Sequence, residues 1–206
     1  MGLTPNRFTR MAALGHLWKV SQDDIVVATC GLTSRELAAV GHRPNHLYVL
    51  NAMGSAVPIG LGLALGTRRR TWVIEGDGGL IMGLNALATV AYALPPELRI
   101  VVLDNGAFCS TGCQETAAAR VDLGACAEGL GISVLRSDDE EGFVRAVDEA
   151  VRAEETRLLH ARIGTESAPG VAYLQADPAA ITHDFVRWLT SRAPEPEAAG
   201  PEAAPT

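Results

Sequence analysis

The sequence has few aromatic residues and few cysteines, and no dense run of basic residues. Phe, Trp and Tyr make up 5% of the 206 residues, and 17 Lys and Arg stand against 24 Asp and Glu, which gives a net charge of −7. Nucleic acids and anionic membrane surfaces bind proteins through clustered basic side chains. We therefore expect neither a nucleic acid nor a membrane as a partner.

The sequence also shows no targeting or membrane-spanning pattern. Its first residues contain no apolar core of about 7–15 residues followed by a small-residue cleavage site, and its apolar stretches are short or interrupted by glycine. The four cysteines have neither the spacing of a zinc site nor that of a small disulfide framework. These absences predict a reduced, cytoplasmic protein. The cysteines are Cys30, Cys109, Cys113 and Cys126.

What the sequence does contain is a regular alternation of short β-branched runs with longer Ala- and Leu-rich stretches. This alternation is typical of an α/β fold with a parallel β-sheet and helices on both faces. The expected strands are Ile25–Ala28, Thr71–Glu75, Arg99–Leu103 and Leu158–Ile163. The expected helices are Arg7–Val20, Ser34–Ala39, Val57–Gly66, Leu80–Ala93, Leu123–Leu130, Glu140–Glu154 and Pro178–Arg192.

The composition changes sharply near the C-terminal end. Residues 1–192 have enough apolar side chains for one core, and we expect them to form a single domain. Residues 193–206 read APEPEAAGPEAAPT, without aromatic or branched apolar residues. Such a segment buries too little surface to offset the entropy of ordering, so we expect a disordered tail.

Two short polar motifs follow two of the expected strands. Gly76-Asp77-Gly78 ends one strand and Asp104-Asn105-Gly106 ends the next, with 25 residues between the motifs. Each motif alone is a common turn. Together they place a carboxylate, an amide oxygen and a close-approach glycine backbone at the ligand-binding edge of a parallel sheet. Oxygen ligands of this kind suit Mg²⁺ and a diphosphate. A dinucleotide fingerprint is excluded because Ile81 stands where its third glycine should be.

These motifs and three neighbouring segments resemble one enzyme family. The segments are TCGLTSREL at Thr29–Leu37, NAMGSAVPIGLGLALG at Asn51–Gly66 and LDNGAFCSTGCQET at Leu103–Thr116. Together with the Gly-Asp-Gly motif they resemble the diphosphate-binding domain of thiamine-diphosphate-dependent enzymes. Within that family they are similar to β subunits of sulfopyruvate decarboxylases and to the C-terminal parts of phosphonopyruvate decarboxylases.

The resemblance implies thiamine diphosphate and Mg²⁺ as cofactors. It makes the side chains of Asp77 and Asn105 and the backbone carbonyl of Ala107 the metal ligands. The backbone amides of Gly78 and Gly79 would contact the diphosphate. Gly31 and Gly76 would be further cofactor contacts.

The same resemblance assigns the Asn51–Gly66 segment to the other end of the cofactor. Met53 would wedge between the two cofactor rings, and the backbone of Asn51 and Met53 would pair with the aminopyrimidine. The other possibility for Met53 is a core gap-filler. The four glycines of this segment predict close approach of a subunit or of the cofactor, and they are Gly54, Gly60, Gly62 and Gly66.

The hydroxyl-rich loop after the second motif supplies candidate substrate contacts. Ser110, Thr111 and Gln114 are expected to contact the substrate, and their polar groups could hold a sulfonate or phosphonate. Met53 is counted with them as a catalytic residue, because it would position the cofactor. The same pattern could equally be a helix N-cap. Thr33, Arg35 and His42 are further candidates, whereas we interpret the His42 and His46 pair as surface loop histidines.

The family's activating glutamate belongs to a second, pyrimidine-binding domain, and this chain has about half the length that both domains need. The resemblance therefore implies a separate α subunit that carries the glutamate, a hetero-oligomer of α2β2 type or larger, and no activity for the chain alone. The expected reaction is decarboxylation of a small 2-oxo acid. Carboligation to an acyloin and a non-catalytic regulatory role remain alternatives. Relatives have glycine in place of Asn51 and proline in place of Glu115, which leaves the substrate open.

Overall fold

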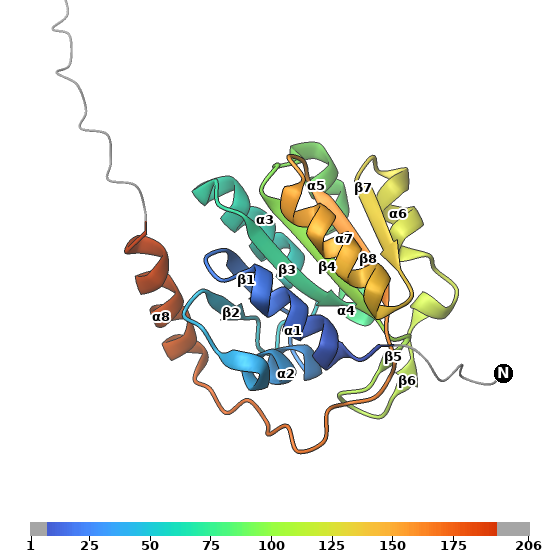
Figure 1. Cartoon of the computed structure of the whole chain (residues 1–206), viewed down its shortest axis with the longest axis horizontal. Coiled ribbons are helices and arrows are strands. Elements are labelled where there is room, and N and C mark those ends of the chain that lie inside the picture. The colour runs from blue at the N-terminus through green and yellow to red at the C-terminus, as the bar shows by residue number, and fades with distance from the viewer. Residues whose placement is uncertain (1–7, 193–206) are drawn as a thin grey trace, which may run out of the picture.

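The computed structural model describes residues 8–192, and its central feature is a six-stranded parallel sheet (Figure 1). The strands lie in the order β2-β1-β3-β4-β8-β7, and all neighbouring pairs are parallel. This confirms the predicted fold class. The strands are β1 (Ile25–Ala28), β2 (His46–Tyr48), β3 (Thr71–Gly76), β4 (Leu98–Asp104), β7 (Ser133–Ser137) and β8 (Arg157–Arg162).

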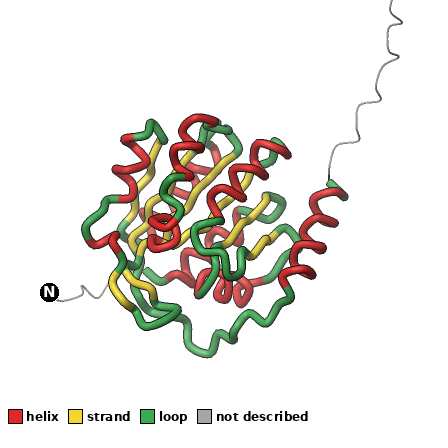
Figure 2. The backbone as a smooth tube through the Cα atoms, turned by 180° about the vertical axis from the view of Figure 1, so that it is seen from behind, coloured by secondary structure: helices red, strands yellow, loops and turns green. Residues whose placement is uncertain are grey.

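Helices cover both faces of this sheet, as the views from the front and from behind show (Figures 1 and 2). The first face is packed by α1 (Arg10–Val20), α2 (Leu32–Gly41) and α7 (Glu140–Arg152). The second face is packed by α3 (Ala56–Thr67), α4 (Asp77–Met82), α5 (Ala86–Ala93) and α6 (Leu123–Gly129). Helix α8 (Pro178–Thr190) closes the edge beside β2.

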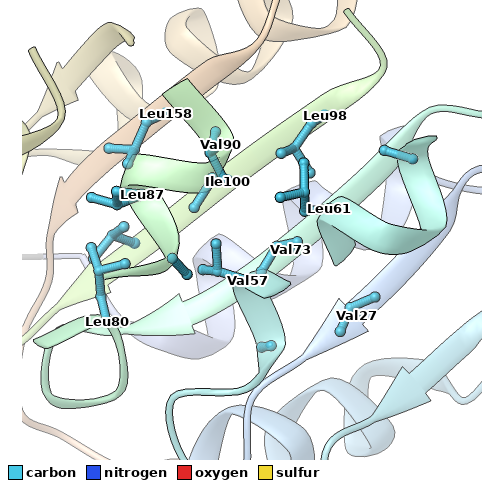
Figure 3. Packing of buried hydrophobic residues seen from close by; sticks show 14 of the residues in the cluster. Val27, Val57, Leu61, Val73, Leu80, Leu87, Val90, Leu98, Ile100 and Leu158 are labelled. Carbon is cyan, nitrogen blue, oxygen red and sulfur yellow. The ribbon is translucent and has the colours of Figure 1, made fainter. Parts of the chain in front are cut away.

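Strand β4 shows why the middle of a central strand is apolar on both faces of the sheet. Ile100 and Val102 point into the core under α3 and α5, while Val101 and Leu103 point into the core under α1 and α7. Successive side chains of a strand alternate between faces, so a strand covered on both sides has consecutive apolar residues, here Ile100–Leu103, with the polar residues Arg99 and Asp104 near its ends. Figure 3 shows Ile100 beneath Leu87 and Val90 of α5.

The predicted helix Leu80–Ala93 is wrong in one respect, because the structure divides it into α4 and α5. The break falls at Gly83, where a side chain would overlap the carbonyl oxygen of Gly54. The helix must end there so that the two backbones can meet. The sequence also did not predict β2, β7, the hairpin β5 (Ala107–Phe108) and β6 (Gln114–Glu115), or the short 3₁₀ helix η1 (Ala117–Ala119). These elements are short, and β7 is only half-buried.

The interpretation of His46 as a surface loop residue is also wrong. His46 begins β2 and is buried, and burial lowers the pKa of its imidazole to about 3. Its Nδ1 lies 3.3 Å from the hydroxyl of Tyr48, and Nδ1 of His42 lies 3.2 Å from the same hydroxyl. A polar first residue concealed this edge strand from the sequence pattern.

Arg99 ties β4 to the end of α7. Its buried guanidinium donates hydrogen bonds to backbone carbonyls near the end of α7 and near the start of β4. The acceptors are the carbonyls of Ala150, Ala153, Glu155, Pro96 and Leu98. We expect Arg99→Met to lower the free energy of unfolding by about 3 kcal/mol, because it leaves several buried carbonyls without a donor. Urea unfolding measures this loss. The control Arg145→Met removes an exposed arginine of α7 and should cost less than about 1 kcal/mol; equal losses would contradict the role of Arg99.

Three expectations concern segments that the structure treats only in part. The expected disordered tail, 193–206, and the first residue of the expected helix Arg7–Val20 lie outside the described residues. The expected single domain, 1–192, is described from residue 8 onward. Within residues 8–192, no helix is both long enough and apolar enough to cross a membrane.

Candidate functional site

A cavity opens at the carboxyl edge of the sheet, between the loops that follow β1, β3 and β4. This is the point where the chain reverses its direction of travel across the sheet, because β2 lies on one side of β1 and β3 on the other (Figure 1). Open parallel sheets bind ligands at such points, where the two diverging loops leave a crevice.

The cavity brings together most of the residues that the two strand-end motifs contribute. Its volume is about 160 Å³, which is smaller than the roughly 300–1,000 Å³ of complete small-molecule pockets. It can therefore enclose only part of a large ligand. The lining residues are Arg10, Thr29, Cys30, Leu32, Thr33, Met53, Glu75, Gly76, Asp77, Gly78, Gly79, Leu103, Asn105, Ala107, Phe108, Cys109, Ser110 and Thr111.

Asp77 is the buried carboxylate of this cavity. It is the first residue of α4, and its Oδ2 accepts a hydrogen bond from the Thr116 hydroxyl. Burial raises the pKa of the Asp77 carboxyl, and the nearby charge of Asp104 raises it further, while the Thr116 hydrogen bond opposes this. A bound cation would offset the cost of holding a charged carboxylate in this place.

Asn105 stands opposite, in the turn after β4. Its Oδ1 accepts from the amide of Ala107 at 3.2 Å, which leaves a lone pair of that oxygen for another partner. Asp104 shapes the same turn, since its Oδ1 accepts from the Gly106 amide at 3.0 Å. The other oxygen of Asp104 lies 2.8 Å from Nε2 of buried His160 on β8. The turn is thus anchored to the neighbouring strand.

These oxygens could hold a hard cation. Asp77, Asn105 and Ala107 line one cavity and offer a carboxylate, an amide oxygen and a backbone carbonyl, the ligand types that Mg²⁺ prefers. Among residues 8–192, no three His, Cys, Asp or Glu side chains gather as a metal site. A cation here would therefore depend on the two neutral oxygens as well as on Asp77.

Gly78 and Gly79, at and after the end of the Gly-Asp-Gly motif, must be glycine because of what packs against them. A side chain at Gly78 would overlap the Phe108 ring, and one at Gly79 would overlap the Glu75 carboxylate. Both glycines lie in the first turn of α4, where backbone amides have no acceptor within the helix. An anion placed in the cavity can approach these amides closely.

Glu75 is a buried carboxyl that our sequence analysis missed. Its Oε1 accepts from the Gly76 amide at 3.0 Å, and its Oε2 is buried without a hydrogen-bond partner in the described part of the chain. Burial raises the pKa of Glu75 to about 7, against the opposing effect of a hydrogen bond with Thr29. At neutral pH, the protein therefore holds this carboxyl partly protonated.

This raised pKa makes the stability of the chain pH-dependent. A carboxyl whose pKa is higher in the folded state stabilises the fold at low pH, and that contribution is lost as pH rises through about 7. Glu75→Gln removes the charge, so we expect it to raise the free energy of unfolding relative to the native chain by about 3 kcal/mol at about pH 8, and by much less at about pH 5. Urea unfolding at both pH values measures this. A difference that does not change with pH would contradict the assignment.

The cavity includes some of the predicted cofactor and substrate residues and excludes others. Met53, Thr33, Ser110 and Thr111 line it, as predicted contacts should. The predicted residues Asn51, Gly31 and Gln114 are not among the lining residues. Gly31 packs against the side chain of Ser110. Gln114 is exposed, and its Oε1 accepts a hydrogen bond from the Thr111 hydroxyl at 3.0 Å.

Two further candidates lie away from the cavity. The guanidinium of Arg35 stacks on the Tyr173 ring, with its Cζ 3.4 Å from the ring centre. His42 follows the last residue of α2, which runs back from the carboxyl edge, so it lies at the opposite edge beside α8. Sequence spacing could not reveal these positions because both follow from the direction of α2.

The loop that carries Ser110 and Thr111 is the turn of the β5–β6 hairpin. The alternative of a helix N-cap is therefore wrong for this segment.

The expectation that the cysteines form no disulfide is wrong for one pair, because the structure joins Cys109 to Cys113 across the turn. Spacing rules for disulfide frameworks do not cover a hairpin turn, which brings two residues four positions apart together. Cys30 and Cys126 are free.

Comparisons with known proteins agree with this geometry. Residues 29–161 match the family model described as thiamine pyrophosphate enzyme, C-terminal TPP binding domain. The sulfopyruvate decarboxylase subunit beta of Methanothermobacter thermautotrophicus is 43% identical over 138 residues, which are 67% of this chain and 75% of that protein. The phosphonopyruvate decarboxylase of Streptomyces viridochromogenes is 37% identical over 192 residues.

That second match covers 92% of this chain and 48% of the relative, so the chain spans about half of the relative's length. A crystal structure of a thiamin diphosphate-dependent enzyme from Mycobacterium smegmatis is similar in fold, with a TM-score of 0.62 at 23% identity. The similarity covers 76% of this chain and 32% of that one.

Proposed function

Because this chain belongs to the thiamine pyrophosphate enzyme family and forms its C-terminal TPP-binding domain, we propose that it is the β subunit of a two-subunit, Mg²⁺-dependent 2-oxo acid decarboxylase. The substrate is a 2-oxo acid with a second anionic group, of the sulfopyruvate or phosphonopyruvate kind. The observation that carries this proposal is the convergence of Asp77, Asn105 and Ala107 on one cavity beside Gly78. Similarity to two decarboxylases over most of the chain supports it.

The residues of the cavity fit the cofactor's diphosphate and its metal. Asp77, Asn105 and the carbonyl of Ala107 hold Mg²⁺, and the amides of Gly78 and Gly79 bind the diphosphate. Glu75, which also lines the cavity, has a buried oxygen that has no partner among the described residues. When bound, thiamine diphosphate supplies the electron sink that decarboxylation requires.

The rest of the site orients the ligand and excludes water. Met53, which lines the cavity, would wedge between the two cofactor rings, and the backbone of Asn51 and Gly31 would complete the cofactor contacts. The Phe108 ring packs against Gly78 at the diphosphate end of the cavity. Ser110 and Thr111 face the substrate from the hairpin, and Gln114 orients the Thr111 hydroxyl.

A partner subunit completes this site. The cavity is too small for the whole cofactor, and we place the glutamate that activates the aminopyrimidine on the partner, in an α2β2 or larger assembly. The docking surface consists of the solvent sides of α3 and α4–α5. Residues 47–67 and 78–96 contain no Asp, Glu, Lys or Arg. Exposed apolar side chains gather on this uncharged face, and they are Leu65, Met82, Tyr92 and Leu94.

The glycines of α3 support the same face. Gly54 and Gly60 pack within the subunit, against Gly83 and Val73, whereas side chains built at Gly62 and Gly66 would meet nothing within 4 Å. Two of the four glycines therefore leave a flat outer surface on α3. A flat, uncharged helix surface allows a neighbouring subunit to approach closely.

The experiment that tests this function is reconstitution with the partner subunit and a substrate panel. The complex should release carbon dioxide and an aldehyde from sulfopyruvate or phosphonopyruvate, and turnover should require both thiamine diphosphate and Mg²⁺. Product analysis separates decarboxylation from carboligation. Formation of an acyloin without free aldehyde would contradict the proposal, and so would turnover that is unchanged after removal of Mg²⁺ by a chelator.

A further inference from the structure

The cavity has one cationic side chain among its lining residues, and the proposed mechanism has not used it. Arg10 begins α1, lines the cavity and is 5% exposed. The acidic side chains in the lining are Glu75 and Asp77. A doubly anionic substrate that enters this cavity meets a carboxylate on one side, and in the described part of the lining only Arg10 offers it a positive charge.

The position of Arg10 is unfavourable for a purely structural residue. A cation in the first turn of a helix opposes the helix dipole, and burial of a guanidinium costs free energy unless its donors are paired. Thr9, which caps the helix, adds no negative charge. Arg10 therefore lies where helix stability alone would favour an acidic or neutral side chain.

Glu36 orients the Arg10 guanidinium without using all its donors. Oε1 of Glu36 accepts from Nη1 of Arg10 at 3.2 Å and also accepts from the Ala168 amide at 3.2 Å. Oε2 of Glu36 is buried and has no partner in residues 8–192. A structural pair of this kind is commonly bidentate, whereas here one N–H group is paired among the described residues. Among residues 8–192, the remaining donors of the guanidinium have no partner and are available to a ligand.

Thr33 supplies a hydroxyl group to the same cavity. Thr33 and Glu36 are three residues apart on α2 and therefore share one face of that helix. Glu36 contacts Arg10, and Thr33 and Arg10 both line the cavity. A guanidinium and a hydroxyl donor in one cavity match the several oxygens of a sulfonate or a phosphonate.

We propose that Arg10 binds the second anionic group of the substrate and makes the enzyme select 2-oxo acids that end in a sulfonate or phosphonate over those with an uncharged end. This inference rests on the proposed decarboxylase function. It adds the residue that determines the specificity of that reaction.

Kinetics of the assembled complex test this inference. Arg10→Met keeps the length of the side chain without its charge, and Arg10→Met/Glu36→Met also removes the buried carboxylate that the single change leaves unpaired. For sulfopyruvate or phosphonopyruvate we expect kcat/KM to fall by about 10- to 100-fold, mainly through KM, as loss of a charge-assisted hydrogen bond predicts. Turnover of pyruvate, which lacks the second anion, should not fall, and the affinity for thiamine diphosphate should stay unchanged.

Two outcomes would overturn the assignment. An equal fall for pyruvate and for the doubly anionic acids in both variants means that Arg10 only supports the structure. Weaker binding of thiamine diphosphate with unchanged discrimination among substrates means that Arg10 serves the cofactor's diphosphate instead.

A binding measurement separates this inference from the proposed function. Phosphonoacetate and sulfoacetate carry the same two anionic groups but cannot be decarboxylated by this chemistry. Calorimetry should detect their binding to the native complex and a loss of at least about 10-fold in affinity for Arg10→Met. If neither acid binds the native complex, or if the variant binds them equally well, the assignment of Arg10 fails whether or not the complex decarboxylates any acid.

Discussion

Replacement of Asp77 by alanine should reduce the Mg²⁺-dependent turnover of the assembled complex by more than about 100-fold. Loss of residues that merely orient a metal ligand typically costs about 10- to 100-fold in affinity or activity, so loss of the ligand itself should cost more. Steady-state kinetics over a range of Mg²⁺ concentrations measure the effect. Retention of normal turnover in the Asp77→Ala complex would leave a non-catalytic role as the better account of this chain.

The fold should survive this change. Burial raises the pKa of the Asp77 carboxyl, which means that its charge is held at a cost in the metal-free protein. Circular dichroism and urea unfolding should therefore show no loss of stability. Asp148→Ala is the matched control, because Asp148 is an exposed aspartate on α7 and its removal should leave turnover and metal dependence unchanged.

The second large effect concerns the partner. The purified chain alone should decarboxylate 2-oxo acids at least about 100-fold more slowly than the complex, because a missing general acid–base typically costs about 10²- to 10⁴-fold. Titration of the partner into a fixed amount of this chain should restore activity to a plateau at a fixed ratio of the subunits. Full activity of the chain alone would contradict both the two-subunit assignment and the partner's glutamate.

Tyr92 tests where the partner docks. Its side chain is 93% exposed on α5, so Tyr92→Asp should not destabilise the isolated chain. An aromatic side chain at the centre of an interface typically contributes about 2 kcal/mol or more, so the substitution should weaken subunit association by at least about 10-fold in analytical ultracentrifugation. The control Glu141→Ala changes an exposed residue of α7 on the opposite face and should leave association unaltered.

The sequence by itself determined the class of the fold and the centre of the site. Strands β1, β3 and β4 were predicted within about one residue, because a strand buried on both faces contains a nearly continuous run of apolar residues. Asp77 and Asn105 were predicted together because each follows such a strand, and parallel strands end at one edge. Local patterns sufficed for these features since each depends on residues close together in the chain.

The tertiary structure alone decided which other side chains complete that centre. Arg10 meets Glu36 across 26 positions, Thr116 meets Asp77 across 39, and His160 meets Asp104 across 56. No spacing rule relates such residues, because their contacts depend on the order of strands and the direction of helices. The break between α4 and α5 at Gly83 also depends on tertiary packing, because the backbone of Gly54 lies directly against Gly83. Local sequence specifies the elements, and their packing specifies the partners of each side chain.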